Sequence, residues 1–194
     1  NVTKGDIYFD DFHVNELSGK QINALRQSIG YVFQDFRLLP KLTVYQNVAF
    51  ALEVIGKSKY RISTSVPQVL DLVGLEDRRD AYPHELSGGE QQRLAIARSI
   101  LLDAPILVLD EATAFADPDS EAAIQRAITE LVAGRTLVVI AHRLHTITGA
   151  DRILMLENGE VTEAGTHEEL VAAGKGYATM WARYQTAQAG IQGE

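Results

Sequence analysis

LSGGEQQRLAIARSILLDAPILVLDEATAFAD, residues 86–117, is the stretch that decides the fold of this 194-residue chain. Within it lies a continuous apolar run, ILVL at residues 106–109, followed directly by two carboxylates, Asp110 and Glu111. A run of this kind is too short for a helix and apolar on both faces, which is typical of a buried strand in a parallel sheet. The pattern predicts an α/β fold with a carboxylate pair at the end of an inner strand.

The carboxylate pair has two interpretations. Open α/β sheets bind ligands at the carboxyl ends of their strands, where one carboxylate can hold magnesium and a second can polarise an attacking water. Alternatively, Asp110 and Glu111 simply end the strand and begin the next turn. The first interpretation is favoured by the segment that precedes the strand.

That segment predicts the start of a helix. Ser87 is a candidate N-cap, and Gly88 and Gly89 allow a close approach of the backbone to a ligand. The helix behind them has an apolar face made of Leu94, Ala97, Ile100 and Leu101. Because a helix N-terminus attracts anions through its N–H groups and its dipole, the segment predicts a phosphate site.

Together these segments resemble the defining motifs of the ATP-binding cassette (ABC) ATPases. LSGGEQQRLAIAR resembles the signature motif, and ILVLDEATAFAD resembles the Walker B strand with its catalytic glutamate and D-loop. The resemblance implies a single ABC ATPase domain over residues 1–194, with a P-loop NTPase (RecA-like) α/β fold. A helical subdomain would cover about residues 43–100, including the signature motif.

Two further polar residues gain a role from the resemblance. Gln34 follows a predicted apolar strand, residues 29–33, in a segment similar to the family's Q-loop. His142 follows a predicted buried strand, residues 136–141, in TLVVIAHRL, which is similar to the segment of the switch histidine. Judged alone, a glutamine or histidine after a strand is more often a surface or structural residue, so both assignments depend on the resemblance.

The resemblance implies catalytic and metal-binding roles for four residues. Glu111 would be the general base, and Asp110 would bind Mg²⁺ with help from Gln34. His142 and Gln34 would contact the γ-phosphate and its attacking water. The implied cofactors are ATP and Mg²⁺.

The resemblance also implies partners. Two ABC domains meet head to tail, and the signature of one contacts the ATP of the other through residues that correspond here to Ser87, Gly88, Gly89 and Glu90. Asp117 would lie at the dimer contact, although residues 114–116, Ala-Phe-Ala, replace the commoner Ser-Ala-Leu before it. Transmembrane transporter domains would be the other partner, which implies a peripheral location at the cytoplasmic face of a membrane.

Composition narrows the function further. The chain has 18 Lys and Arg against 26 Asp and Glu, a formal net charge of −8, so it lacks the excess of basic residues on which nucleic-acid binding depends. It has no cysteine, which excludes disulfides and thiolate metal sites. No apolar run approaches the roughly 20 residues needed to span a bilayer, so the chain is expected to be soluble.

One motif of the family is missing. The chain contains no phosphate loop of the form G-x-x-x-x-G-K-[ST]. The nearest match, Gly56-Lys57-Ser58, has Ala51 in the place of the first glycine and ends a predicted helix instead of beginning one. The resemblance starts partway through the family's domain, so a truncation at the N-terminus is expected.

Two functions follow from these observations. The first is the ATP-hydrolysing domain of an ABC transporter, inactive alone because it lacks the loop. The alternative is a non-hydrolysing module that lends its signature motif to an intact ABC partner.

The subtype of ABC protein stays open, because the Gln34 segment is similar to importer-type or cell-division proteins, whereas residues 150–172 resemble the tail of exporter-type domains.

Local signals predict the remaining elements. Capping boxes predict helix starts at Thr43 and Thr166, and Pro67 predicts a helix over residues 66–73 with the proline in its first turn. Asn158-Gly159 predicts a hairpin. Further predicted elements are a strand at residues 5–9 and helices at residues 124–131 and 177–187.

Overall fold

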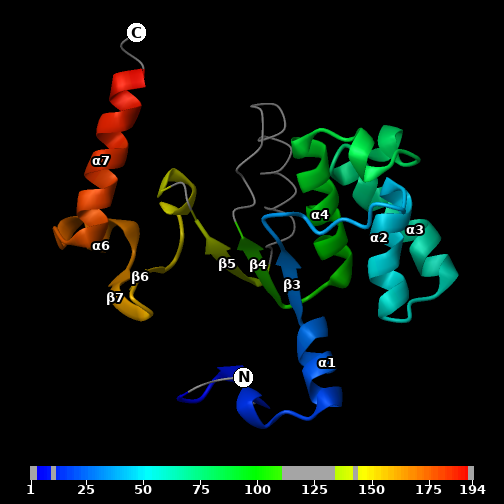
Figure 1. Cartoon of the computed structure of the whole chain (residues 1–194), viewed down its shortest axis with the longest axis horizontal. Helices are drawn as coiled ribbons and strands as arrows, with labels where there is room; N and C mark the ends of the chain where they lie inside the picture. The colour runs from blue at the N-terminus through cyan, green and yellow to red at the C-terminus, as the bar shows by residue number, and fades with distance from the viewer. Residues whose placement is uncertain (1–3, 10–11, 111–133, 142–143, 192–194) are drawn as a thin grey trace. The chain divides into compact units, whose positions relative to one another are not determined.

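The computed structural model describes residues 4–9, 12–110, 134–141 and 144–191. The chain divides into two compact units, Asn1–Ile140 and Ala141–Glu194. Figure 1 shows the elements of both. The helix predicted for residues 124–131 lies outside the described residues.

In its described residues, the first unit is built on a three-stranded parallel sheet. Its order is β3 (Ile29–Val32), β4 (Ile106–Asp110) and β5 (Thr136–Ile140), so that β4 is central. Asp110 is the last residue of β4, as the apolar run predicted. Because the strands are parallel, their carboxyl ends lie at one edge of the sheet, and the Asp110 carboxylate lies at that edge.

Three helices pack together in the first unit. Helix α4 (Gly88–Leu102) contacts β3 and lies against α2 (Val44–Val54) and α3 (Lys59–Leu72) (Figure 1). Their common core joins residues that are almost completely buried, among them Val48, Leu70, Leu94, Ile96 and Leu107. This core anchors the signature helix between the sheet and the other helices.

The start of α3 corrects one prediction. The helix begins at Lys59, and Pro67 lies inside it, so the prediction of a start near residue 66 was wrong. A proline inside a helix removes a hydrogen bond and usually ends the helix. Here the Ser58 side chain caps the helix by accepting a hydrogen bond from the Arg61 N–H at 3.3 Å. Burial of one apolar face of the helix offsets the hydrogen bond lost at Pro67. That face consists of Ile62, Val66, Val69 and Leu70.

Two predicted strands also differ from the structure. The strand predicted for residues 5–9 shortens to β1 (Tyr8–Phe9), which pairs with β2 (Phe12–His13). The strand predicted to be buried, β5, exposes 46% of Val138 and 44% of Ile140. Among the described strands, β5 pairs only with β4, so it lies at an edge of the described sheet.

Shorter elements complete the first unit. They are η1 (Val14–Glu16), α1 (Gly19–Gln27), η2 (Glu76–Arg78) and η3 (Pro83–Glu85). Helix α2 starts at the predicted capping box, where the Thr43 side chain accepts from the Gln46 N–H at 3.3 Å.

Close packing between β3 and β4 gives a stability prediction. A Cβ atom on Gly30 would lie 2.8 Å from the Cδ1 of Leu107, which is buried. Gly30→Ala is therefore expected to lower the free energy of unfolding by about 1–3 kcal/mol, the usual cost of overpacking. Gly19→Ala is the matched control, because a Cβ there has no neighbour within 4 Å. Urea denaturation that gave both variants the same midpoint would contradict this account of β3.

The second unit contains a hairpin and two helices. Its elements are η4 (Leu144–Ile147), β6 (Ile153–Glu157), β7 (Glu160–Gly165), α6 (His167–Ala172) and α7 (Gly176–Ile191). The predicted turn joins β6 to β7, with φ of 53° at Asn158 and 84° at Gly159. The predicted capping box at Thr166 begins α6, and the core consists of Ile153, Leu170 and Tyr177.

Candidate functional site

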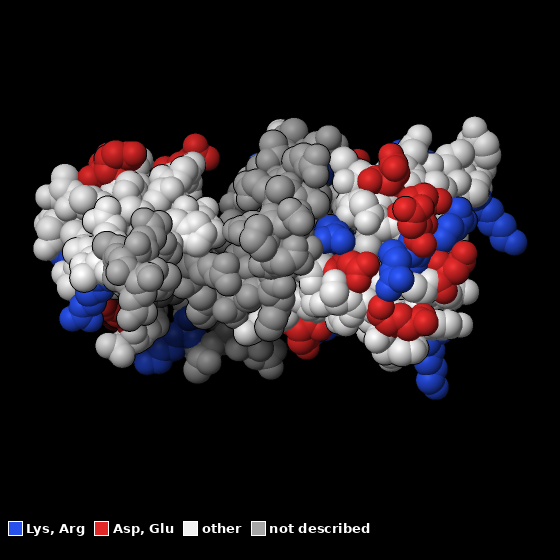
Figure 2. All heavy atoms as spheres, turned by 90° about the horizontal axis from the view of Figure 1, so that it is seen from above, with Lys and Arg blue, Asp and Glu red and all other residues white. Residues whose placement is uncertain are grey.

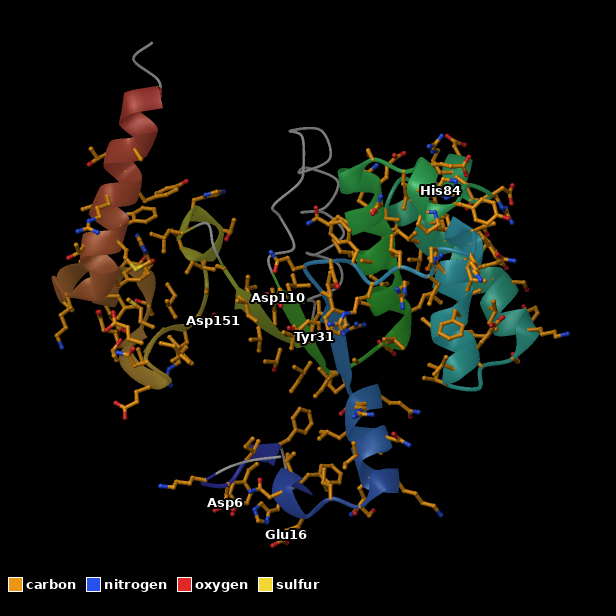
Figure 3. All side chains as sticks on the ribbon, in the orientation of Figure 1. Asp6, Glu16, Tyr31, His84, Asp110 and Asp151 are labelled. Atoms are coloured by element: carbon orange, nitrogen blue, oxygen red, sulfur yellow. The ribbon has the colours of Figure 1, made fainter. Side chains whose placement is uncertain are left out.

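The Asp110 carboxylate is held by a neighbouring strand. The Tyr31 hydroxyl donates a hydrogen bond of 3.0 Å to Oδ2 of Asp110, and Figure 3 labels both residues at the sheet. Burial, followed by this hydrogen bond, raises the pKa of Tyr31 above its usual value of 10.0. The phenol is therefore protonated at neutral pH and acts as a donor to the carboxylate.

Gln34 is exposed in the turn that follows β3. Phe36 and Arg37, shortly after it, have φ of 56° and 44°, a left-handed conformation that costs energy for residues with a side chain. The turn is fixed from α4, because Nη1 of Arg98 donates to the carbonyl oxygen of Arg37 at 2.8 Å. Burial lowers the pKa of Arg98 below the usual value for an arginine.

The signature segment forms the capped helix start that the sequence predicted. Oγ of Ser87 accepts from the Glu90 N–H at 3.3 Å, and Oε2 of Glu90 accepts from the Ser87 N–H at 2.8 Å. The N–H groups of Gly88 and Gly89 belong to the first turn, where a helix leaves donors without intrahelical partners. The segment can therefore present backbone donors to an anion.

Glu90 holds this capping box in place. Burial raises its pKa, but the hydrogen bonds from Ser87 and the charges of Arg78 and Arg93 outweigh that effect, so the pKa lies below 4.5. A carboxylate with a lowered folded-state pKa stabilises the fold above its unfolded-state pKa. Because its pKa is lowered, Glu90 is ionised at neutral pH. Its contribution to the stability of the fold is lost only as the pH falls through the lowered pKa.

The structure brings some of the predicted site residues together. Gln34 and Asp110 follow or end the adjacent strands β3 and β4, at the same edge of the sheet. Within the described residues no hydrogen bond joins the signature segment to either of them. Glu111, Asp117 and His142 lie outside the described residues.

Asp110 fits a magnesium site. No group of three or more His, Cys, Asp or Glu side chains forms a metal site in the described part of the chain. Proteins commonly hold Mg²⁺ through only one or two carboxylates, with nucleotide phosphates and waters as the other ligands. A single half-exposed carboxylate at the strand end therefore matches the donor set that the family implies.

Tyr31 and Arg98 are the residues that the sequence interpretation missed. Arg98 ends the segment that resembles the signature motif and Tyr31 lies in the strand before Gln34, but the sequence assigned a role to neither. Each acts through a partner far along the chain, 79 residues away for Tyr31 and 61 for Arg98. The available signal for Tyr31 was a hydroxyl in a strand that was otherwise predicted to be interior.

The charged surface has both signs. On the face shown in Figure 2, acidic and basic side chains alternate over the helices of the first unit. Some of them form ion pairs, such as Arg79 with Glu76 at 2.9 Å and Arg78 with Glu90 at 3.4 Å. None of the helices in the described ranges is both long and apolar enough to cross a membrane.

Comparison with known families and sequences gives a consistent result. The family model described as "ABC transporter" matches residues 1–114. The mycobactin import ATP-binding/permease protein IrtA of Mycolicibacterium thermoresistibile is 44% identical over 98% of this chain, which spans 21% of the length of IrtA. The cell division ATP-binding protein FtsE of Streptococcus pneumoniae is 41% identical over 82% of this chain and 70% of its own length.

Solved structures agree with this result. The dimeric, post-hydrolysis ATP-binding cassette MJ0796 bound to ADP and Pi has a TM-score of 0.77 and 31% identity, covering 85% of this chain and 74% of its own. A bacterial Atm1-family ABC exporter with ATP bound has a TM-score of 0.72 and 35% identity over 83% of this chain and 29% of its own.

Proposed function

Since the chain belongs to the ABC transporter family of ATP-binding proteins, we propose that it is the ATP-hydrolysing part of a transporter that drives transmembrane transport. The observation that carries this proposal is Asp110, which ends the central strand β4 beside the Gln34 turn. A family fold supports many activities, but a carboxylate at this edge of the sheet is suited to phosphate chemistry.

The proposed chemistry divides the work among few side chains. Asp110 would hold Mg²⁺, which when bound offsets the negative charge of the β- and γ-phosphates. Glu111 would accept the proton of the attacking water, and Gln34 and His142 would orient that water and the γ-phosphate. In the sequence, Gln34 follows β3, Glu111 follows β4 and His142 follows β5, so these strands would fix the positions of the three residues.

The signature helix is proposed to act across a dimer. Its N-terminus, capped by Ser87 and Glu90, would close over ATP held by a second ABC domain, with Gly88 and Gly89 donating backbone N–H groups to the phosphates. Asp117 would contact the partner domain. The dimeric MJ0796 structures support a second ABC domain as the partner.

A transmembrane partner is proposed for the helices of the first unit. Phe50 and Val54, four residues apart on one face of α2, are 39% and 63% exposed. Apolar side chains exposed in this way suit a partner surface. Docking to a transporter's transmembrane domains would place the chain peripherally at the cytoplasmic face of the membrane.

A second function is proposed for the chain on its own, namely a module that completes the ATP site of an intact ABC domain. The observation that favours it is the capping box of α4, which is formed by residues of this chain alone. Such a module would need no phosphate loop of its own.

The 194-residue chain is expected to show no Mg²⁺-dependent ATP hydrolysis above background. Its sequence has no phosphate loop to hold the β- and γ-phosphates. Phosphate release should be compared with that of the chain joined at Asn1 to the phosphate-loop segment of an ABC relative, which is expected to hydrolyse ATP. Turnover by the unjoined chain that Glu111→Gln abolishes would contradict the expectation, and inactivity of the joined protein would count against the proposed hydrolysis.

A further inference from the structure

A row of side chains connects Asp110 to the turn that carries Gln34. Tyr31 pairs with Val108 in the parallel register of β3 and β4. Because side chains alternate along a strand, Tyr31 shares a face of the sheet with Asp110, two residues beyond Val108. Figure 3 labels Tyr31 and Asp110. The Tyr31 hydroxyl lies 3.0 Å from the carboxylate, and the Tyr31 ring centroid lies 4.2 Å from that of Phe33.

The row continues from the sheet to the signature helix. The guanidinium carbon of Arg37 lies 3.8 Å from the centroid of the Phe33 ring. The carbonyl oxygen of Arg37 accepts from Arg98, which belongs to α4. The Gln34 turn therefore lies between two attachments, one to the signature helix through Arg98 and one to Asp110 through Tyr31.

We propose that Tyr31 is a positioning residue for the Asp110 carboxylate, which it holds in a fixed orientation relative to the Gln34 turn. Within the described residues, Tyr31 supplies the only side-chain hydrogen bond to Asp110. The bond engages Oδ2, and no described residue hydrogen-bonds Oδ1, so Oδ1 can bind a metal ion or one of its waters. The inference rests on the proposed function, since positioning matters for catalysis only if Asp110 serves a metal.

The contact itself can be tested in the 194-residue chain without nucleotide. In a sample with ¹³C-labelled aspartate carboxyl groups, the Asp110 resonance is identified by its loss in Asp110→Asn. Tyr31→Phe removes only the hydroxyl and is expected to shift this resonance. Tyr60→Phe is the matched control, because Tyr60 is 79% exposed, and it should leave the resonance in place. An Asp110 resonance that Tyr31→Phe does not move overturns the inference.

The positioning role is tested in the chain joined to a phosphate-loop segment, with Mn²⁺ in place of Mg²⁺. Electron paramagnetic resonance measures Mn²⁺ affinity in the presence of ATP, and fluorescent ATP measures nucleotide affinity without metal. Tyr31→Phe is expected to weaken Mn²⁺ binding about 10-fold, as is typical of residues that orient a metal ligand, while metal-free ATP affinity stays unchanged. Tyr60→Phe should change neither.

The other outcomes are decisive in different ways. An equal loss of Mn²⁺ and metal-free ATP affinity would assign Tyr31 a merely structural role and overturn the inference. If Tyr31→Phe does not fold, Phe33→Leu takes its place, because it removes the ring that supports Tyr31; unchanged Mn²⁺ affinity in that variant also overturns the inference. Failure of the parent protein to bind Mn²⁺ with ATP would instead refute the proposed function, while the ¹³C shift still reports on the contact.

Discussion

Glu111→Gln, in the chain joined to a phosphate-loop segment, is expected to lower ATP turnover by about 10²–10⁴-fold, the range for loss of a positioned general base. Glu111 directly follows Asp110, the last residue of β4, so the strand would bring both carboxylates to the nucleotide. The amide has nearly the same size as the carboxylate but does not accept a proton from water. ATP affinity, measured separately, is expected to persist.

The control for this prediction is Glu53→Gln, because Glu53 is exposed on α2. The control substitution removes the same charge at a distance from the sheet edge and should leave turnover within about twofold of the parent, as is usual for a surface substitution. Loss of ATP binding in Glu111→Gln, in proportion to the loss of turnover, would mean that Glu111 is structural.

Three helix starts and the central strand were predictable from the sequence because local chemistry determines them. A hydroxyl at the N-cap and a carboxylate or amide three residues later form the capping boxes at Thr43, Ser87 and Thr166. The apolar run before Asp110 likewise predicted β4, the central strand. Features set by neighbouring residues in the chain therefore appear where they were expected.

Features that depend on distant partners were not predictable in the same way. Pro67 suggested a helix start, but burial of the α3 face carries the helix through it. The apolar pattern of β5 predicted burial, but burial depends on the elements that pack over the two faces of a strand; β5 lies at an edge of the described sheet, and Val138 and Ile140 are exposed. The Tyr31–Asp110 hydrogen bond depends on the register of two strands that are far apart in sequence.

Ser87→Arg is expected to abolish ATP-dependent pairing of this chain with an intact ABC domain. The Ser87 hydroxyl caps α4, and the first-turn N–H groups behind it would face the ATP of the partner. A long cationic side chain at this position would fill the space of the phosphates and remove the cap. The effect should be the loss of the complex and not a graded weakening.

Ser58→Arg is the control that separates the loss of a helix cap from the filling of the phosphate site. Ser58 caps α3 in the same manner, since its side chain accepts from the Arg61 N–H at 3.3 Å, but it lies outside the signature motif. Both substitutions remove a helix cap, which costs about 1 kcal/mol. Only Ser87→Arg should prevent pairing.

The most direct test of the central claim, that this chain supplies the signature half of an ABC ATP site, is the mass of the complex in solution. Light scattering would be recorded for the 194-residue chain mixed with an intact, hydrolysis-blocked ABC domain, with and without ATP. The account predicts a heterodimer that requires ATP, persists with Ser58→Arg and is lost with Ser87→Arg. No heterodimer with ATP, or one that Ser87→Arg leaves unchanged, would contradict it.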